Sequence, residues 1–343
     1  MDTSARRAAD TLPSPWPAVG RTVVLLTALV GVLLTAFTWP AVRSHVHDVP
    51  IAVAGPPPAV RQVGAALDQR LPNGFAVTEV ADAAAAERLI RDREVYGAID
   101  VSSGTPQVIT ASAASTAVAQ TLQGVAAGLG QAPGAGRTSP VRELVALPAD
   151  DPRGTGLAAG ALPLVMGGLL AALLLTRLVR GTAPRVGGAL AFAITGGLAV
   201  AAILQFWFGS LDGSYLANTG AIALATAATS LSVIGLESLL GYAGFALGAV
   251  TMMLIGNPLS GTSTAPEMLP GRSGTLGQLL PPGAGGRLLR STAFFEGHGA
   301  THSVLVLTAW LVFGVALCLA GGLPKRRRRL AAAPDESTEN AAA

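Results

Sequence analysis

The chain has 343 residues, of which half are hydrophobic and only 13% are charged, whereas an ordinary soluble domain has about 25% charged residues. The mean hydropathy is +0.52, so the composition excludes an ordinary soluble globular protein. The sequence pI is about 9.6, but the basic residues gather beside apolar segments, where they orient membrane proteins and meet anionic lipid headgroups. We therefore expect a lipid bilayer as a partner and no nucleic acid.

Six segments of the sequence contain no charged residue, and each is long enough to cross a bilayer, which takes about 20 apolar residues. They cover residues 22–42, 154–176, 186–211, 213–236, 238–266 and 303–324. We predict a polytopic α-helical membrane protein with six transmembrane helices, five of them in one domain over 154–324. The first, over 22–43, is expected to be an uncleaved signal anchor. Its apolar run is longer than the about 7 to 15 residues of a signal-peptide core, and no small-residue cleavage pattern ends it.

Clusters of basic residues predict the orientation of the chain, because cytoplasmic segments of membrane proteins carry an excess of Lys and Arg. The clusters are Arg6, Arg7 and Arg21 in the N-terminal tail 1–21, Arg177, Arg180 and Arg185 between the second and third windows, and Lys325 to Arg329 after the sixth. Six crossings place all of them on one side. We therefore expect both termini in the cytoplasm and residues 44–153 and the loop 256–302 outside, although Arg272, Arg287 and Arg290 in that loop fit the rule less well.

The inserted segment 44–153 alternates between strand and helix patterns. Short apolar or alternating runs predict strands, and apolar residues at helical spacing predict helices. The predicted strands cover 51–54, 75–80, 95–101 and 107–111, and the predicted helices cover 60–71, 82–93 and 115–129. Asp82 is expected to cap its helix, with Leu89 and Ile90 facing inward. This order predicts a small α/β extracytoplasmic domain, which ends in a flexible joint rich in Gly, Ala and Pro near 130–140.

The composition and the C-terminal end indicate a source and a location. All basic residues except Lys325 are arginine, which together with abundant Ala and Gly is typical of a bacterial genome rich in G and C. The expected location is therefore the bacterial plasma membrane. Residues 325–343 are basic at first and then polar and rich in Ala, so we expect a disordered cytoplasmic tail after the last helix.

The sequence carries no motif that predicts an enzyme or a cofactor site. It has no G-x-x-x-x-G-K-[ST] phosphate loop, since its only lysine follows the last apolar window, so any nucleotide energy has to come from another subunit. His298 and His302 are four residues apart but lack the Glu of an H-E-x-x-H metal motif. The single cysteine, Cys318, lies inside an apolar window and is expected to have a packing role.

The apolar windows contain no Asp, Glu, His or Lys, although proton-coupled transporters generally carry such residues at membrane depth. Proton-driven antiport is therefore not expected. Glu237 falls in the predicted turn between the fourth and fifth windows, and we expect it to be a solvated interfacial residue.

Two stretches of the sequence carry patterns that go beyond hydropathy. They are residues 82–101, DAAAAERLIRDREVYGAIDV, and residues 279–295, LLPPGAGGRLLRSTAFF. With one N-terminal span, a large external domain and five clustered spans, the chain resembles the permease subunits of type 2 ABC exporters, in particular the phage-infection-protein branch. The first stretch resembles that family's helix followed by a strand ending in V-x-G-A-I, and the second resembles its proline-glycine segment before the last span. The resemblance covers about residues 23–322.

The resemblance implies that the five clustered helices pair with those of a second permease, as a homodimer or a heterodimer. It also implies that a cytoplasmic ATPase docks on the loop between the second and third spans. Arg177, Arg180 and Arg185 would then contact the ATPase. The alternative is that these arginines only fix the topology of the loop.

The loop 256–302 contains too many Gly and Pro residues for a continuous helix, yet its stretch 273–286 has apolar residues. We expect a half-inserted element at the outer face, with its backbone shielded by protein. Its members are Leu276, Leu279, Leu280, Pro281 and Pro282. The resemblance implies that this element closes an outward exit; otherwise it caps the helical bundle.

The expected function is export of a hydrophobic or amphipathic substrate by a permease whose ATPase is supplied by another chain. The alternative is a non-transporting membrane scaffold or receptor, whose external domain binds components of the cell envelope or of a secretion system.

Overall fold

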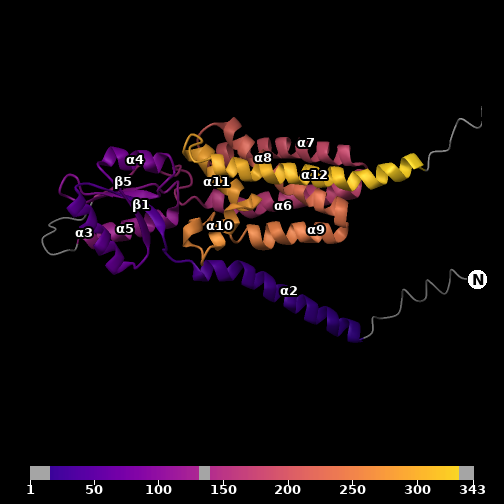
Figure 1. Ribbon diagram of the computed structural model, residues 1–343, viewed down its shortest axis with the longest axis horizontal. Helices are drawn as coiled ribbons and strands as arrows, with labels where there is room; N and C mark the ends of the chain where they lie inside the picture. The colour runs from indigo at the N-terminus through magenta and orange to yellow at the C-terminus, as the bar shows by residue number, and fades with distance from the viewer. Residues whose placement is uncertain (1–15, 131–139, 332–343) are drawn as a thin grey trace, which may run out of the picture.

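The molecule has two parts, an α/β domain at one end and a bundle of long helices at the other (Figure 1). The computed structural model describes residues 16–130 and 140–331. Helix α2 (Trp16–Arg43) leads into the α/β domain, and the bundle follows that domain in the chain. This arrangement agrees with a helical membrane protein into which a small α/β domain is inserted after the first apolar helix.

The bundle is built from apolar helices. They are α6 (Thr155–Leu178), α7 (Thr182–Ala202) with its π-helical continuation η1 (Ile203–Trp207), α8 (Tyr215–Leu240), α9 (Tyr242–Ala249) with its continuation η2 (Val250–Gly256), and α12 (Thr301–Ala331). Within the described residues, five helices are long and apolar enough to cross a membrane: α2, α6, α7 with η1, α8 and the part of α12 up to Gly322. Five of the six predicted windows therefore coincide with such helices, as expected for a multi-pass membrane protein.

The fifth predicted window, 238–266, contains a shorter helix than expected. Gly241 separates α8 from α9 with φ +63° and ψ −140°, a conformation that residues with a side chain rarely adopt. The helical stretch Tyr242–Gly256 consists of 8 α-helical and 7 π-helical residues. It is at most about 22 Å long, whereas the hydrocarbon core of a bilayer is about 30 Å thick. A sixth crossing therefore stays a prediction.

Helix α8 lies at the centre of the bundle, and 72% of its most apolar window is buried. It contacts α6, α7, α9, α12 and α11 (Pro281–Phe294). A Cβ on Gly314 of α12 would lie 2.5 Å from backbone atoms of Leu231 and Ser232, so α12 comes this close to α8 only because residue 314 is glycine. Ser232 Oγ also donates to the carbonyl oxygen of Trp310 in α12 at 3.1 Å.

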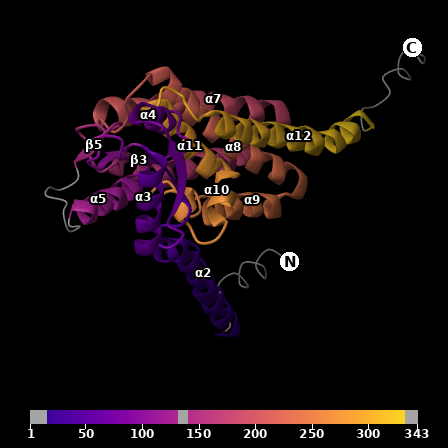
Figure 2. The same cartoon turned by 60° about the vertical axis from the view of Figure 1, so that its left-hand side comes forward.

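Most of helix α2 stands apart from the other helices (Figure 2), and among them the helix contacts η2. None of its most apolar window is buried in the protein, which suits a helix surrounded by lipid. It begins, and α12 ends, at the end of the bundle remote from the α/β domain (Figure 1). The start of α2 and the end of α12 thus lie on the same side of the bundle, as an even number of membrane crossings between them requires. α12 remains helical to Ala331, beyond the predicted end of the last window at 324, and most of the predicted tails lie outside the described residues.

The α/β domain contains a five-stranded sheet in the order β2-β1-β3-β4-β5. Its strands are β1 (Val49–Ala54), β2 (Phe75–Val80), β3 (Gly97–Asp100), β4 (Gln107–Thr110) and β5 (Val141–Glu143). β1 is parallel to β2 and β3, β4 is antiparallel to β3, and β5 is parallel to β4. The four predicted strands are present. β5 was not predicted because its 3 residues are too few to show an alternating pattern, and the predicted flexible joint falls mainly on 131–139, outside the described residues.

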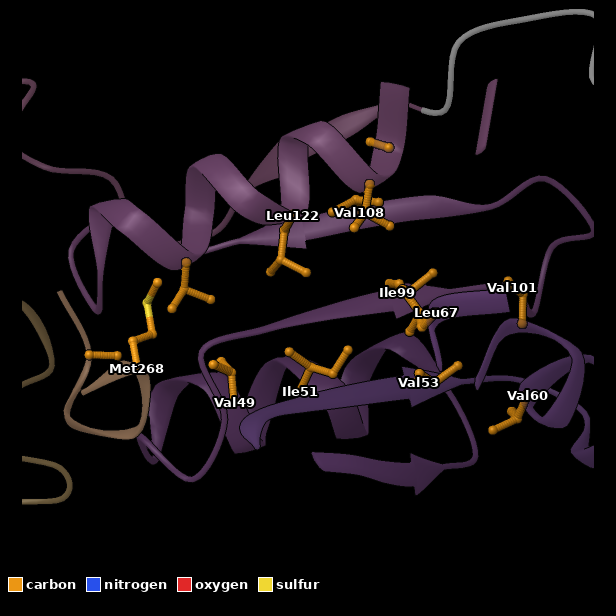
Figure 3. Packing of buried hydrophobic residues seen from close by; sticks show 14 residues of the cluster. Val49, Ile51, Val53, Val60, Leu67, Ile99, Val101, Val108, Leu122 and Met268 are labelled. Carbon is orange, nitrogen blue, oxygen red and sulfur yellow. The ribbon is translucent and has the colours of Figure 1, made fainter. Parts of the chain in front are cut away.

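Helices cover both faces of the sheet. α3 (Pro57–Arg70) and α5 (Thr116–Gly130) pack on one face, in a core that includes Ile51, Ile99 and Leu122 (Figure 3). α4 (Ala83–Arg91) packs on the other face. The two faces give the domain two separate apolar cores, which explains why the sequence alternates between strands and helices with apolar stripes.

The predicted start and inward face of α4 are confirmed. Asp82 Oδ1 accepts the N–H of Ala85 at 2.7 Å, so Asp82 caps the helix. Ile90 is fully buried, and Leu89 is half-buried against the same core. The spacing of these residues was therefore sufficient to predict both the cap and the packing face.

Candidate functional site

The α/β domain and the helical bundle meet at a junction made by the segment between η2 and α12. This segment folds into η3 (Pro266–Met268), α10 (Ser273–Gln278) and α11, as expected from its many Gly and Pro residues. Met268 is buried in the domain core beside Val49 at the start of β1 (Figure 3), and Phe295 is buried in the core on the α4 side. The segment therefore belongs to both parts of the molecule.

Arg290 connects the two parts through its guanidinium. Its Nη1 donates to the carbonyl oxygen of Ala114 at 2.6 Å, and its Nη2 donates to that of Thr262 at 3.0 Å. Ala114 lies in the α/β domain just before α5, whereas Thr262 lies in the loop before η3. Burial lowers the pKa of Arg290, because a charged group loses solvation there.

Arg93 reaches the same place from the end of α4, where its backbone has φ +61°. Its Nη1 donates to Ser291 Oγ at 2.6 Å and to the carbonyl oxygen of Arg287 at 2.9 Å, and its guanidinium lies 5.1 Å from the centre of the Phe295 ring. Burial, and then the nearby charges of Arg290 and Arg287, lower the pKa of Arg93 to about 9. We call Arg93, Arg287 and Arg290 the junction arginines.

The junction arginines face few negative charges. Glu267 is close to them but accepts the hydroxyl of Tyr96 at 2.9 Å, and burial and then Glu267 raise the pKa of Tyr96, so Tyr96 stays neutral. Glu94 borders the same region but is exposed. Among the described residues, the buried Nε of Arg287 and the buried Oε1 of Gln278 have no hydrogen-bond partner. Since buried polar atoms are normally paired, these two atoms indicate bonding positions that the protein itself leaves open.

Two cavities meet at this junction. The first, which we call the junction chamber, is lined by the junction arginines, Tyr96 and Gln278. It has about 20 Å³ of room for water-sized groups within a region of about 330 Å³ that is partly open to the surroundings. The second, which we call the bundle cavity, lies between α6, α8 and α11. It has about 40 Å³ of room for water-sized groups within a partly open region of about 490 Å³, and side chains such as Leu164, Ile222 and Leu289 make its lining mostly apolar.

Thr262 and Gly286 line both cavities, and we call this pair the neck. A Cβ on Gly286 would lie 3.0 Å from Thr262 Oγ1, so even a methyl group at position 286 fits only if the threonine side chain shifts. A larger side chain at this position would fill the space where the polar chamber adjoins the apolar cavity.

The predicted outer gate residues divide into two groups. Leu280 and Pro281 are buried, and Pro281 and Pro282 line the bundle cavity. Leu276 and Leu279 are instead 48% and 47% exposed. The structure thus brings the two prolines to the cavity and leaves these two leucines at the surface, while a gating role for the element stays a prediction.

The predicted ATPase contacts lie at the other end of the bundle, where α6 leads into α7. Arg177 is in the last turn of α6, Arg180 is in the connecting loop, and Arg185 is in the first turn of α7. Arg177 and Arg180 are exposed. Arg185 instead donates from Nη2 and Nε to two carbonyl oxygens at the end of α6, at 2.7 and 2.8 Å. Its Nη1 pairs with Glu237 at 3.3 Å, where the two side chains are only 19% and 24% exposed. Arg185 therefore connects this end of α6 and α7 to α8. Glu237 was expected to be a solvated residue in a turn, but it lies in the last turn of α8 and is partly buried in this ion pair.

A third hollow, which we call the domain crevice, lies at the carboxyl ends of β1, β2 and β3. Gly55, Pro57, Glu79 and Ser102 line it, and it has about 870 Å³ of widely open space. Because β2 and β3 lie on opposite sides of β1 and α3 and α4 lie on opposite faces, the strand order reverses here, where open α/β sheets bind ligands. The prolines at the start of α3 lack the N–H groups that hold phosphate at a helix N-terminus.

In the part of the chain that the structure describes, no group of three or more His, Cys, Asp or Glu side chains lies together in a way that could hold a metal ion. No family model, curated protein or solved structure matches the chain. The resemblance to exporter permeases therefore rests on the layout and the two quoted stretches alone.

Proposed function

We propose that this chain is the membrane permease subunit of an ABC-type exporter, which moves a hydrophobic or amphipathic substrate outward with an ATPase supplied by another chain. The observation that carries the proposal is the neck, where the apolar bundle cavity and the polar junction chamber share Thr262 and Gly286. An amphipathic molecule needs both environments side by side, because its tail is stabilised away from water while its headgroup requires polar partners.

An external source of energy fits the sequence. The apolar windows lack the carboxylates, histidines and lysines that carry protons in gradient-driven transporters, and the chain lacks a phosphate loop. In this proposal both termini are cytoplasmic in the bacterial plasma membrane, and the helical stretch Tyr242–Gly256 completes a sixth crossing. The ATPase then docks at the end of the bundle that presents the exposed Arg177 and Arg180.

The junction supports a mechanical link between the bundle and the α/β domain. α11 lines the bundle cavity, and the flanking residues Met268 and Phe295 are buried in the two cores of the domain. A movement of α11 that widens the cavity would therefore displace the domain as well. A second permease, of the same or another kind, would complete the translocation path, as the resemblance implies.

The proposal is tested by purifying the full chain from its own host in mild detergent and by deleting the gene of any copurifying ATPase. We expect an ATP-binding-cassette ATPase in the complex and loss of the export phenotype in the deletion strain. Absence of an ATPase from the wild-type complex, together with an export phenotype that persists after the deletion of neighbouring ATPase genes, would contradict the proposal.

One observation favours a second function, that of a receptor or scaffold. The domain crevice lies at the end of the sheet opposite Met268 and the junction, near Val60 and Val101 (Figure 3), where a soluble ligand or an envelope component has access. A receptor predicts that blocking this crevice, for example by Ser102→Trp, abolishes the phenotype while substitutions in the bundle cavity leave it unchanged. The exporter function predicts instead that substitutions in the bundle cavity abolish the phenotype and that blocking the crevice leaves it unchanged.

A further inference from the structure

We infer that the junction chamber binds the anionic headgroup of an amphiphile, a phosphate or a carboxylate, while the apolar tail of the same molecule occupies the bundle cavity. This inference names the substrate class of the exporter proposed above and rests on that proposal for its role in transport. Binding itself does not depend on transport and is tested separately.

The first argument is the charge of the chamber. Three guanidinium groups come together, and the nearest carboxylate, Glu267, is already hydrogen-bonded to Tyr96. Burial lowers the pKa values of both Arg93 and Arg290, and the charges of Arg290 and Arg287 lower the pKa of Arg93 further, because like charges repel one another more strongly when they are removed from water. A bound anion would remove the repulsion, and the planar guanidinium matches phosphate and carboxylate oxygens in geometry.

The three junction arginines differ in how many of their donors are already used by the protein. Arg93 and Arg290 are fixed by hydrogen bonds to protein oxygens, so their remaining donors are held in place. Arg287 has a buried Nε without a partner among the described residues, as has Gln278 Oε1. The first atom is a donor for an anionic oxygen, and the second is an acceptor for a hydroxyl or amine of a headgroup.

The third argument is the neighbouring bundle cavity. An inorganic anion would account for the arginines but not for an apolar cavity that shares the neck with them. Residue 286 is glycine, and the atoms nearest to its missing side chain all belong to Thr262, so a chain of methylene groups can approach the arginines along α11 once the Thr262 side chain rotates away. Burial of methylene groups in an apolar cavity is favourable, so a tail adds affinity that a free anion lacks.

The test measures binding to the purified full chain in a neutral detergent by native mass spectrometry. The probes are phosphatidylglycerol, phosphatidylcholine with the same acyl chains, and inorganic phosphate. We expect phosphatidylglycerol to bind in preference to both of the others. Arg287→Gln should weaken its binding about tenfold or more, since a hydrogen bond to a charged group is lost, whereas Arg287→Lys, which keeps the charge but lacks the Nε donor and the planar guanidinium, should weaken it less than Arg287→Gln does.

Two further variants keep the test sharp. Arg272→Gln removes an exposed arginine of the same segment and should leave binding unchanged. Gly286→Leu fills the neck and should weaken phosphatidylglycerol binding while inorganic phosphate binds as before. The circular dichroism spectrum and thermal transition of each variant show whether it is folded.

Several outcomes would overturn the inference. They are equal binding of phosphatidylglycerol and phosphatidylcholine, equal effects of the substitutions at 287 and 272, and phosphate binding as tight as lipid binding with no effect of Gly286→Leu. Each of these leaves the exporter proposal intact, because a different substrate would still depend on an ATPase. Conversely, if phosphatidylglycerol binds as expected but export does not depend on an ATPase, the headgroup site is retained and the exporter proposal is contradicted.

Discussion

Two groups of three arginines lie at opposite ends of the helical bundle, and their surroundings differ. At the far end, Arg177 and Arg180 are exposed and Arg185 pairs with Glu237. At the domain end, the junction arginines are enclosed with few carboxylates, and two of them have lowered pKa values. Exposed arginines beside a membrane helix fix topology at little cost, whereas enclosed ones need a counter-charge. The comparison shows that the poorly balanced cluster, rather than the more obvious exposed one, is the stronger candidate for a binding site.

The largest expected difference between the two ends is their accessibility from outside the cell. In a Cys318→Ala background, a cysteine at Arg61 in α3 should react with an impermeant maleimide in intact cells, and a cysteine at Arg180 should not. Both positions are exposed in the protein, so only the membrane distinguishes them. Reaction at position 180 alone, or at both positions, would contradict the proposed orientation.

The second prediction compares the stabilities of the two ends. Arg290→Gln should lower the free energy of unfolding of the full chain by about 2–5 kcal/mol, because the buried carbonyl oxygens of Ala114 and Thr262 lose their donors. Arg180→Gln, an exposed control, should change it by less than about 0.5 kcal/mol. Unfolding in detergent followed by circular dichroism measures both. Equal effects would show that Arg290 does not hold the junction together.

The third prediction concerns the domain end of α6. The Asp151 carboxylate accepts the backbone N–H groups of Thr155 and Gly156 at 2.8 and 2.7 Å. Burial alone would raise its pKa, but these hydrogen bonds outweigh burial and the pKa is lowered. The lowered pKa contributes stability that is present above the unfolded value of about 3.9 and is lost as the pH falls through the folded value.

We therefore expect Asp151→Asn to destabilise the chain by about 1–2 kcal/mol at neutral pH and to remove this part of the pH dependence. Asp150→Asn, a substitution at the exposed neighbouring residue, serves as the control. When unfolding is measured from pH 7 to pH 3, the free energies of unfolding of Asp151→Asn and of the unsubstituted chain should converge at low pH. Parallel curves for Asp151→Asn and the unsubstituted chain would rule out the capping role.

The smallest effect is expected at the far end. Glu237→Gln removes the ion pair with Arg185 but leaves the two bonds from Arg185 to the end of α6. Because both side chains are partly solvated, the loss should be below about 1 kcal/mol and should become smaller in high salt. A loss comparable to that of Arg290→Gln would mean that the far end is held as tightly as the junction.

The regular elements could be predicted from the sequence because they depend on local patterns. The apolar windows marked the long helices, and Asp82 and Ile90 marked the start and the buried face of α4. Local patterns also explain why the helix in the fifth window is shorter than expected. Hydropathy averages over Gly241, although its backbone conformation ends one helix and starts another.

The candidate site could not be predicted because it depends on contacts between distant residues. Arg93 and Arg287 are separated by 194 positions, and no spacing rule connects them. The only sequence signal was that Arg287 and Arg290 fit the charge rule poorly in a loop placed outside. The ion pair between Arg185 and Glu237 could not be predicted for the same reason, since 52 positions separate the two residues.

The central claim is that an amphipathic substrate leaves the cell through the bundle cavity with energy from a separate ATPase. The most direct test is the efflux of a fluorescent fatty acid from loaded cells that carry the unsubstituted chain, Gly286→Leu, or a deletion of the ATPase gene. We predict fast efflux in the first strain and equally slow efflux in the other two. Equal efflux rates in all three strains would contradict the claim.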